Sequence, residues 1–257
     1  MRALARLLFV LAAFCTAPAA AEPLRIVGYE NTRLLPAVGE GPYGRLMAEL
    51  LARVGTSVDL RVLPGKRANL MMYGRPRRAD CEFPSALEHL TAKTRSGNRL
   101  IESRAMNHAR AHVFTRPGST PVRRMEDLHG KQVGIVRGFG YGAEMNALIE
   151  LGSRAPIRFV EVDDELQHVR LLTLTSRVDA ILGYLPEIAI ELEQAGAGDV
   201  VYDPAFPLLQ TGDRLLCHHS VAAEKLIQAM DKQLQAMGES GALKRILGAY
   251  YLSPTSQ

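Results

Sequence analysis

Near the middle of the chain stands the stretch KQVGIVRGFGYG, residues 131–142. Its apolar run ends at Val136, and glycines then follow at alternate positions, which is typical of a buried strand that turns sharply into a helix. The helix is predicted over residues 143–151, and an alternating pattern predicts a further strand over residues 157–162. Because a strand, a helix and a strand follow one another in this order, the pattern indicates parallel pairing in an α/β fold.

The same order of strands and helices extends in both directions. Toward the N-terminus, residues 24–29 and 58–63 are predicted as strands, with a helix between them that ends at Gly55. Toward the C-terminus, the expected order is a helix, a strand and two terminal helices, over residues 165–175, 178–182, 226–238 and 242–251. The chain is therefore interpreted as two α/β units of about 100 residues each, a common domain size.

The composition excludes some classes of protein. Of the 257 residues, 47% are hydrophobic, 23% charged and 6% aromatic, so the chain can form one or two cores and is not intrinsically disordered as a whole. The formal net charge is +4, and Arg2 and Arg6 in the predicted leader contribute two of the positive charges. We therefore expect no nucleic-acid partner, which would require a clustered face of Lys and Arg.

An N-terminal leader, residues 1–21, has the pattern of a secretory signal peptide. Its two arginines give a positive start, residues 7–14 form an apolar run of eight, and residues 19–21 are three alanines. The apolar run is too short to span a membrane, which takes ~20 residues. We therefore expect cleavage after Ala21 and export to the periplasm.

The chain has three cysteines, Cys15, Cys81 and Cys217. Cys15 lies in the leader, where the bulky Phe14 before it disfavours a lipid anchor. For Cys81 and Cys217 two alternatives stay open, a disulfide formed in an oxidising compartment or two separate buried thiols. Since the sequence has no Cys-x-x-Cys motif and no Cys/His cluster, we expect no metal site and no cofactor.

Four stretches of the sequence resemble the family 3 extracellular solute-binding proteins, the amino-acid receptors of bacterial import systems. They are LRIVGY at 24–29, DLHGKQVGI at 127–135, VDAIL at 178–182 and the C-terminal part from 226 to 251. The resemblance covers essentially the whole chain after the leader. It implies a small-molecule ligand, the permease of an ABC-type importer as a membrane partner, and a monomer.

The resemblance also implies a two-lobed α/β fold like that of periplasmic binding proteins. Each lobe would be a mostly parallel sheet flanked by helices, and two hinge crossings would join the lobes. On this basis the first lobe is discontinuous, with residues 23–113 and 215–257, and the second lobe has residues 114–214. Ligand contacts to both lobes exist only in the closed form, so a ligand would shift the population toward closure.

Candidate ligand-binding residues lie in the loops after the strands, because ligands of open parallel sheets bind beyond the carboxyl ends of the strands. In the glycine-rich loop, backbone N–H groups at the start of a helix attract anions, although a tight turn without a ligand has the same pattern. From these loops we select Tyr29, Glu30, Ser85, Gly138, Phe139, Gly140, Tyr141 and Tyr184.

Two arginines become candidates through the resemblance. Family members that bind α-amino acids hold the carboxylate with an arginine shortly before a run that ends in serine, and Arg95 is the nearest match, with Arg99 as a rival. Arg67 follows Pro64 in a Pro-x-x-Arg pattern, where other members place an aromatic residue over the ligand, so it favours an anionic or planar ligand. The alternative for Arg95 is a solvated surface charge, and for Arg67 a salt bridge.

The sequence departs from the family at one expected carboxylate. Amino-acid receptors of the family have an acidic residue just after the strand equivalent to residues 178–182, and it pairs with the ammonium group of the ligand. This chain has Gly183 and Tyr184 there, and Asp179 is the earlier, structural aspartate of the pattern. An ammonium group buried without a partner would be costly. Either Glu30 supplies the carboxylate from the first lobe, or the ligand lacks an α-ammonium group.

Binding is favoured over catalysis. Glu30 and Glu82 lie near strand ends, but nothing pairs them as an acid and a base, and the sequence has no Gly-x-Ser-x-Gly or Cys/His nucleophile arrangement. We expect a periplasmic receptor that closes on a small polar or anionic, amino-acid-like ligand and presents it to an importer without chemistry. The alternatives are a periplasmic sensor or accessory protein, or a dehydratase-like enzyme, of the same fold.

Overall fold

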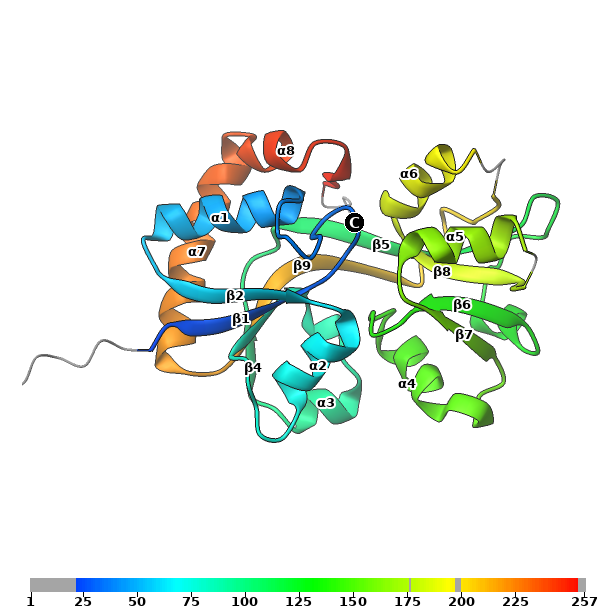
Figure 1. The fold of residues 1–257 in the computed structure, drawn as a ribbon, viewed down its shortest axis with the longest axis horizontal. Helices are drawn as coiled ribbons and strands as arrows, with labels where there is room; N and C mark the ends of the chain where they lie inside the picture. The colour runs from blue at the N-terminus through cyan, green and yellow to red at the C-terminus, as the bar shows by residue number, and fades with distance from the viewer. Residues whose placement is uncertain (1–21, 176, 197–199, 254–257) are drawn as a thin grey trace, which may run out of the picture.

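The computed structural model describes residues 22–175, 177–196 and 200–253 of the chain. Two lobes lie side by side, and each is a sheet flanked by helices (Figure 1). The predicted signal peptide lies outside the described residues. Where the chain is described, no helix combines the length and the apolar character that crossing a membrane requires.

The first lobe is built around β1 (Leu24–Tyr29), which pairs in parallel with β2 (Val58–Leu63) and with β3 (Cys81–Ser85). The helix α1 (Pro42–Val54) connects β1 to β2, and α2 (Gly65–Tyr73) connects β2 to β3. The order of strand, helix and strand that the sequence indicated is therefore confirmed. It places the carboxyl ends of all three strands at one edge of the sheet.

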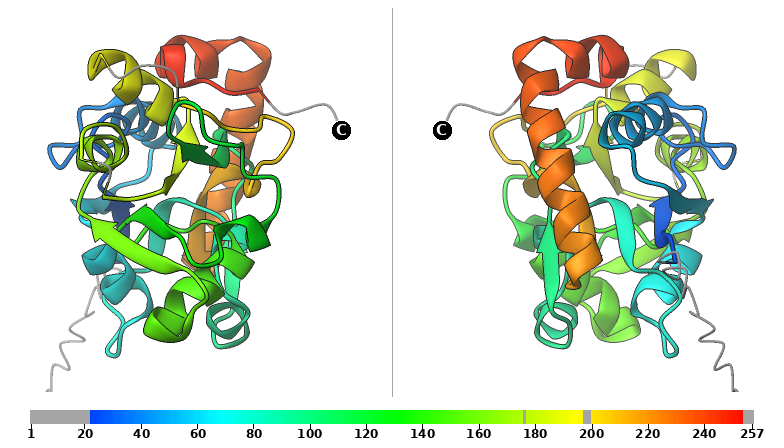
Figure 2. Two further views of the ribbon diagram at one scale, coloured as in Figure 1. Left: turned by 90° about the vertical axis from the view of Figure 1, so that its right-hand side faces the viewer. Right: turned by 90° about the vertical axis from the view of Figure 1, so that its left-hand side faces the viewer.

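Both faces of this sheet are covered. Successive residues of a strand point to opposite faces, so Ile26 packs in one cluster with Met47 of α1 and Met230 of α7 (Val221–Glu239), whereas Val27 packs with Met72 of α2. Figure 2 shows α7 along the outer side of the first lobe. The C-terminal part thus folds back on the N-terminal lobe. The remaining short elements of this lobe are the 3-10 turn Leu87–His89, α3 (Ala92–Ser96), β4 (Leu100–Glu102), α8 (Ala242–Leu247) and the 3-10 turn Gly248–Tyr250.

The second lobe repeats the parallel arrangement. The strand β6 (Gln132–Val136), predicted from the apolar run that ends at Val136, pairs in parallel with β7 (Arg158–Val162) and β8 (Ala180–Leu185). Its helices are α4 (Ala143–Leu151), α5 (Glu165–Thr173) and α6 (Glu187–Gln194), with 3-10 turns at Met125–Leu128 and Gly152–Arg154. Buried side chains of this lobe form two clusters of their own, separate from those of the first lobe.

Two long strands cross between the lobes (Figure 1). β5 (Asn107–Thr115) and β9 (Leu209–His218) pair with each other in antiparallel orientation. β9 also pairs with β3 of the first lobe, and β5 pairs with β8 of the second. The proposed lobe boundaries at residues 113 and 215 fall inside these strands, and they stay a prediction.

A disulfide joins Cys81 of β3 to Cys217 of β9, which face each other in the antiparallel register. The sequence left open whether these cysteines are bonded, because residues 136 positions apart cannot be placed in space by spacing alone. The disulfide connects the first parallel unit to the strand that returns from the second lobe. It therefore stabilises the attachment of β9 to the first lobe.

Candidate functional site

A cavity of about 580 Å³ lies between the two lobes. Such a volume suits a small organic ligand. From the first lobe the lining includes Tyr29, Tyr73 and Ser85, which come from β1, α2 and β3. From the second lobe it includes Phe139, which follows β6, and Tyr184, which lies in β8. The cavity thus opens at the carboxyl ends of the parallel strands of both lobes.

The structure brings six of the ten candidate residues into this lining. They are Tyr29, Ser85, Gly138, Phe139, Gly140 and Tyr184. Their shared feature is a position at the end of a parallel strand, which the order of elements in the sequence was sufficient to predict. Whether they bind a ligand stays a prediction.

The other four candidates do not line this cavity. Arg67 and Arg95 are exposed, on α2 and α3, and Thr91 and Thr94 line the cavity in the region of α3 instead. Glu30 is half-buried outside the lining. Tyr141 is buried behind it, where its ring stacks on that of Tyr184 at 5.9 Å between centroids and its hydroxyl accepts a hydrogen bond from the N–H of Val136.

A buried carboxylate holds one wall of the cavity from behind. Glu82 of β3 accepts hydrogen bonds from the hydroxyls of Tyr29 at 2.8 Å, Tyr73 at 2.6 Å and Ser85 at 2.7 Å. Burial raises the pKa of Glu82, and the three hydrogen bonds oppose that rise because they favour the ionised form. Glu82 is outside the lining itself, so its role is to orient the three side chains that face the cavity.

Asp213 lies deep in the cavity, on the crossing strand β9, and is 7% exposed. The hydroxyl of Tyr43 in α1 donates a hydrogen bond to it, and Tyr43 in turn accepts one from the amide of Asn107 in β5 at 2.9 Å. Burial raises the pKa of Asp213 to about 6, although the hydrogen bond from Tyr43 and the charge of Arg214 act in the opposite direction.

Glu187 is a second buried carboxylate in the lining. It is the first residue of α6, follows Pro186, and is 8% exposed. Burial raises its pKa to about 8, its own backbone N–H lowers it, and the charges of Asp213 and Glu165 raise it further. Among the atoms of the described residues, its Oε2 has no hydrogen-bond partner. A buried polar atom in that condition is uncommon and points to a missing partner.

The remaining charges do not balance these two carboxylates. Lys66 is exposed, and Arg137 binds Glu161 and Asp163, each at 2.7 Å. His89 lines the cavity too, but burial lowers its pKa to about 4, so the imidazole is neutral at pH 7. Among the described residues, the deep part of the cavity therefore has acidic groups for which the structure shows no free neighbouring cation.

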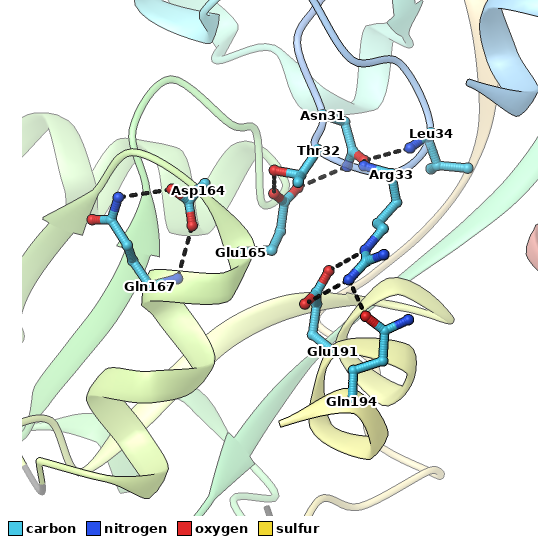
Figure 3. A network of polar contacts seen from close by, with 9 residues as sticks. All are labelled: Asn31, Thr32, Arg33, Leu34, Asp164, Glu165, Gln167, Glu191 and Gln194. Carbon is cyan, nitrogen blue, oxygen red and sulfur yellow. Dashed lines mark hydrogen bonds and ion pairs between the residues drawn. The ribbon is translucent and has the colours of Figure 1, made fainter. Parts of the chain in front are cut away.

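Direct contacts join the lobes on one side of the cavity (Figure 3). The loop after β1 carries Asn31, whose amide donates to Glu165 of α5 at 2.7 Å, and Arg33, whose guanidinium binds Glu191 of α6 at 2.6 Å and contacts Gln194. Asn31 also shapes its own loop, since its side-chain oxygen accepts the backbone N–H groups two and three residues further on.

A second set of contacts joins the lobes near the glycine-rich loop. The amide of Asn69 in α2 donates to the carbonyl of Gly138 at 3.2 Å, and that of Asn146 in α4 donates to the carbonyl of His89. Gly138 has a φ of 84°, and a Cβ there would lie 2.5 Å from the backbone N of Lys66. Only glycine permits this approach. Both sets of contacts therefore join the two lobes directly.

The sequence did not single out Glu187, Asp213, Tyr43 or His89. Glu187 carried one usable signal, since it is the first carboxylate after the strand that ends at Leu185. Asp213 carried none, because it lies inside a strand whose pairing with β5 brings distant parts of the chain together. In the described part of the chain, no group of three or more His, Cys, Asp and Glu residues is placed to hold a metal ion.

Comparisons with known proteins give matches by structure alone. No protein-family model and no curated protein sequence matches the chain. The ligand-binding core of GluR0 from Nostoc punctiforme, in complex with L-glutamate, superposes with a TM-score of 0.68 at 16% identity, over 89% of this chain and 99% of that one.

Two further solved structures are similar. The substrate-binding protein of an amino acid ABC transporter has a TM-score of 0.64 at 13% identity, over 89% of this chain and 98% of that one. A histidine kinase sensor domain with similarity to periplasmic binding proteins has a TM-score of 0.65 at 15% identity, over 91% and 98%. Likeness at these identities establishes the fold, so the expected two-lobed periplasmic-binding-protein-like fold is confirmed.

Proposed function

We propose that this protein is a periplasmic receptor that closes on a small polar solute between its two lobes. The observation that carries this proposal is the cavity of about 580 Å³ lined by both lobes, with side-chain contacts between the lobes on two sides of it. A ligand held by residues of both lobes is bound fully only when they are closed. Its binding free energy therefore favours the closed form.

The proposed role includes delivery of the solute to the permease of an ABC importer. One similar structure is a substrate-binding protein of an amino acid ABC transporter, which supports this partner. The alternative, a periplasmic sensor, has support from the similar histidine kinase sensor domain. We take residues 1–21 as the signal peptide, residues 23–113 with 215–257 as the first lobe, and residues 114–214 as the second.

We propose binding without chemistry. Glu82, which the sequence offered as an acid or base, already accepts three hydrogen bonds behind the cavity wall, and one of them comes from Ser85 of the lining. A dehydratase-like enzyme of the same fold would convert a bound compound. Analysis of the compound recovered after prolonged incubation with the protein separates the two.

The test uses the mature chain, residues 22–257, purified without refolding. Native mass spectrometry identifies any compound that co-purifies, and calorimetry measures its binding after removal by dialysis. Ligand at 100 times its Kd should stabilise the protein by about 2.7 kcal/mol. A compound recovered unchanged supports a receptor, and turnover would assign an enzyme.

Closure is measured in the same sample. Val221 on α7 and Leu174 after α5 are 66% and 69% exposed, and they belong to different lobes. Thiol-reactive dyes can be attached to cysteines introduced as Val221→Cys and Leu174→Cys. The native Cys81 and Cys217 do not compete for the dyes, because they are bonded to each other. Ligand should change the energy transfer between the dyes and reduce the radius of gyration in scattering. A protein that binds nothing and whose two lobes keep one fixed separation would overturn the proposal.

A further inference from the structure

We propose that the ligand is a small organic cation, an amine or guanidine without a carboxylate, whose charged group is held by Glu187 and Asp213. This inference rests on the proposed function and specifies its ligand class. Both side chains line the cavity and are more than nine-tenths buried. The free Oε2 of Glu187 lacks the donor that an ammonium or guanidinium group would bring.

The two carboxylates come from different parts of the fold. Glu187 begins α6 in the second lobe, and Asp213 lies on the crossing strand β9. The charge of Asp213 acts on Glu187, so they form an interacting pair of like charges. Two buried carboxylates near each other favour a positive charge between them, because it removes both the repulsion and the cost of an unpaired buried ion.

Among the described residues, Arg214 is the positive charge that acts on the pair, and it has partners of its own. From β9, Arg214 acts on Asp213, but its side chain binds Glu102 at 3.5 Å and donates to the carbonyl of Ser103 at 2.9 Å. From α5, Glu165 adds a further negative charge near Glu187. His89 also lines the cavity and could carry a positive charge, but its lowered pKa keeps the imidazole neutral at pH 7.

The aromatic lining suits the same ligand class. The rings of Tyr43 and Tyr184 line the cavity together with the two carboxylates, and Phe139, Tyr29 and Tyr73 complete an aromatic wall. Organic cations are attracted to aromatic faces, and this attraction increases in a desolvated site. An amine with an apolar body could therefore pair its charge with the carboxylates and pack its apolar part against the aromatic side chains.

A carboxylate on the ligand would find a weaker partner. Among the described residues of the lining, Lys66 is a cation for which no ion pair is found, but it is exposed, and an exposed ion pair contributes little. The two candidate arginines, Arg67 and Arg95, are exposed and outside the lining. Arg137 lines the cavity but already binds two carboxylates. Burying an unpaired carboxylate would oppose binding. The chain thus differs from a receptor in which an arginine clamps an α-carboxylate.

Protons replace the cation when the ligand is absent. At pH 7 Glu187, with a pKa of about 8, is mostly protonated, and Asp213, with a pKa of about 6, is mostly ionised. A cation binds the ionised pair, so its binding releases a proton from Glu187. Affinity should therefore rise with pH between about 6 and 8, by up to tenfold per unit.

The experiment measures binding of matched probes to the mature protein by calorimetry. 1,5-Diaminopentane, L-lysine and pimelate share a five-carbon body and differ in the ammonium and carboxylate groups attached to it, and agmatine and L-arginine form a second matched set. We expect each amine without a carboxylate to bind at least tenfold more tightly than its carboxylated partner. We also expect the heat of binding at pH 7 to differ between phosphate and Tris, as proton release requires.

Variants of the two carboxylates test whether they hold the charged group of the ligand. Glu187→Gln and Asp213→Asn should each weaken amine binding at least tenfold, and Glu187→Gln should remove the pH dependence. Glu193→Gln is the matched control, because it removes the same charge from an exposed position of α6 outside the lining and should change affinity less than threefold. Arg95→Ala should leave affinity unchanged. Thermal unfolding of each variant verifies that it is folded.

The outcomes separate this inference from the proposed function. One outcome is that the lobes close on a carboxylated ligand and Glu187→Gln binds it as the wild type does. The receptor function is then supported and the proposed cationic ligand is wrong. The cation is also wrong if no amine binds more tightly than its matched acid, or if Arg95→Ala weakens binding tenfold. If no compound closes the lobes, both the proposed receptor function and the proposed cationic ligand are wrong.

Discussion

The guanidinium group of Arg33 binds the carboxylate of Glu191 across the cleft, with Nε 2.6 Å from Oε1, although the residues are 158 positions apart. Arg33 belongs to a loop of the first lobe that Asn31 shapes, and Glu191 projects from α6 of the second lobe (Figure 3). The Glu191 side chain is 1% exposed, so the pair is better shielded from water than an ordinary surface ion pair. The contact joins the two lobes directly, and we expect it to break if they open.

Arg33→Ala should therefore shift the protein toward the open form. A charge-assisted hydrogen bond of this kind contributes about 1 to 2 kcal/mol, so we expect ligand affinity to fall about 5- to 30-fold. Scattering of the ligand-free variant should show a larger radius of gyration than the wild type. The matched control is Arg53→Ala, which breaks the exposed pair with Glu49 within α1 and should change neither quantity. Equal affinity in the two variants would show that the Arg33 contact does not hold the lobes together.

Gly138→Ala should prevent full closure. Its Cβ would lie 2.5 Å from the backbone N of Lys66 in the opposite lobe, and its φ of 84° adds strain. Gly118→Ala is a matched control, because its φ is 78° and a Cβ there meets nothing within 4 Å. Both variants should lose about 1 to 2 kcal/mol of stability from the backbone, measured by urea unfolding. Only Gly138→Ala should lose ligand affinity, by at least tenfold, and similar binding by both would contradict the close approach.

The Cys81–Cys217 disulfide should contribute stability without acting on the ligand. It links residues 136 positions apart, and closing a long loop lowers the entropy of the unfolded chain. The double variant Cys81→Ser, Cys217→Ser should lose about 2 to 5 kcal/mol of unfolding free energy, and a reductant should destabilise the wild type but not the variant. Ligand affinity should be unchanged, since neither cysteine lines the cavity. Equal stability of the wild type in oxidising and reducing buffer would argue against the bond.

Local sequence patterns predicted the parallel units because each depends on neighbouring residues. The run that ends at Val136 became β6, and the helix predicted over 143–151 is α4. The crossing strand was found only in part. The resemblance placed one hinge crossing at residues 113 and 114, whereas β5 is Asn107–Thr115. Its alternation of His108, Arg110 and His112 with apolar residues was the signal that would have extended it.

The candidate site was predictable only where it depends on strand ends. Tyr29, Ser85 and Tyr184 reach the cavity because parallel strands end at one edge. The position of Asp213 depends on the antiparallel pairing of β9 with β5, in which Asn107 faces Asp213. No local pattern contains a pairing between residues that far apart. The deep carboxylates therefore became visible only in the folded chain.

Glu187 should make the stability of the ligand-free protein fall as the pH rises. Burial raises its pKa from 4.5 in the unfolded chain to about 8 in the folded one, so the folded state binds more protons between these values. Stability from this group is fully present below pH 4.5 and is lost as the pH rises through 8. The loss should be on the order of 1 to 4 kcal/mol.

Other buried groups titrate in the same range, so the comparison must be made against a variant. Burial lowers the pKa of His89 and His168 to about 4, which makes the folded state bind fewer protons than the unfolded chain between about 4 and 6.5. Their contribution rises with pH there and opposes that of Glu187. Above pH 6.5 the two histidines no longer compete. The decline should therefore be clearest between pH 6.5 and 8.

The measurement is urea unfolding of the wild type and Glu187→Gln at several pH values from 5 to 9. The variant cannot ionise at this position, so the difference in unfolding free energy between the two proteins should grow with pH, with the wild type becoming the less stable. A constant difference for Glu187→Gln would mean that its carboxyl is not buried against Asp213, and the cation site would lose its first partner.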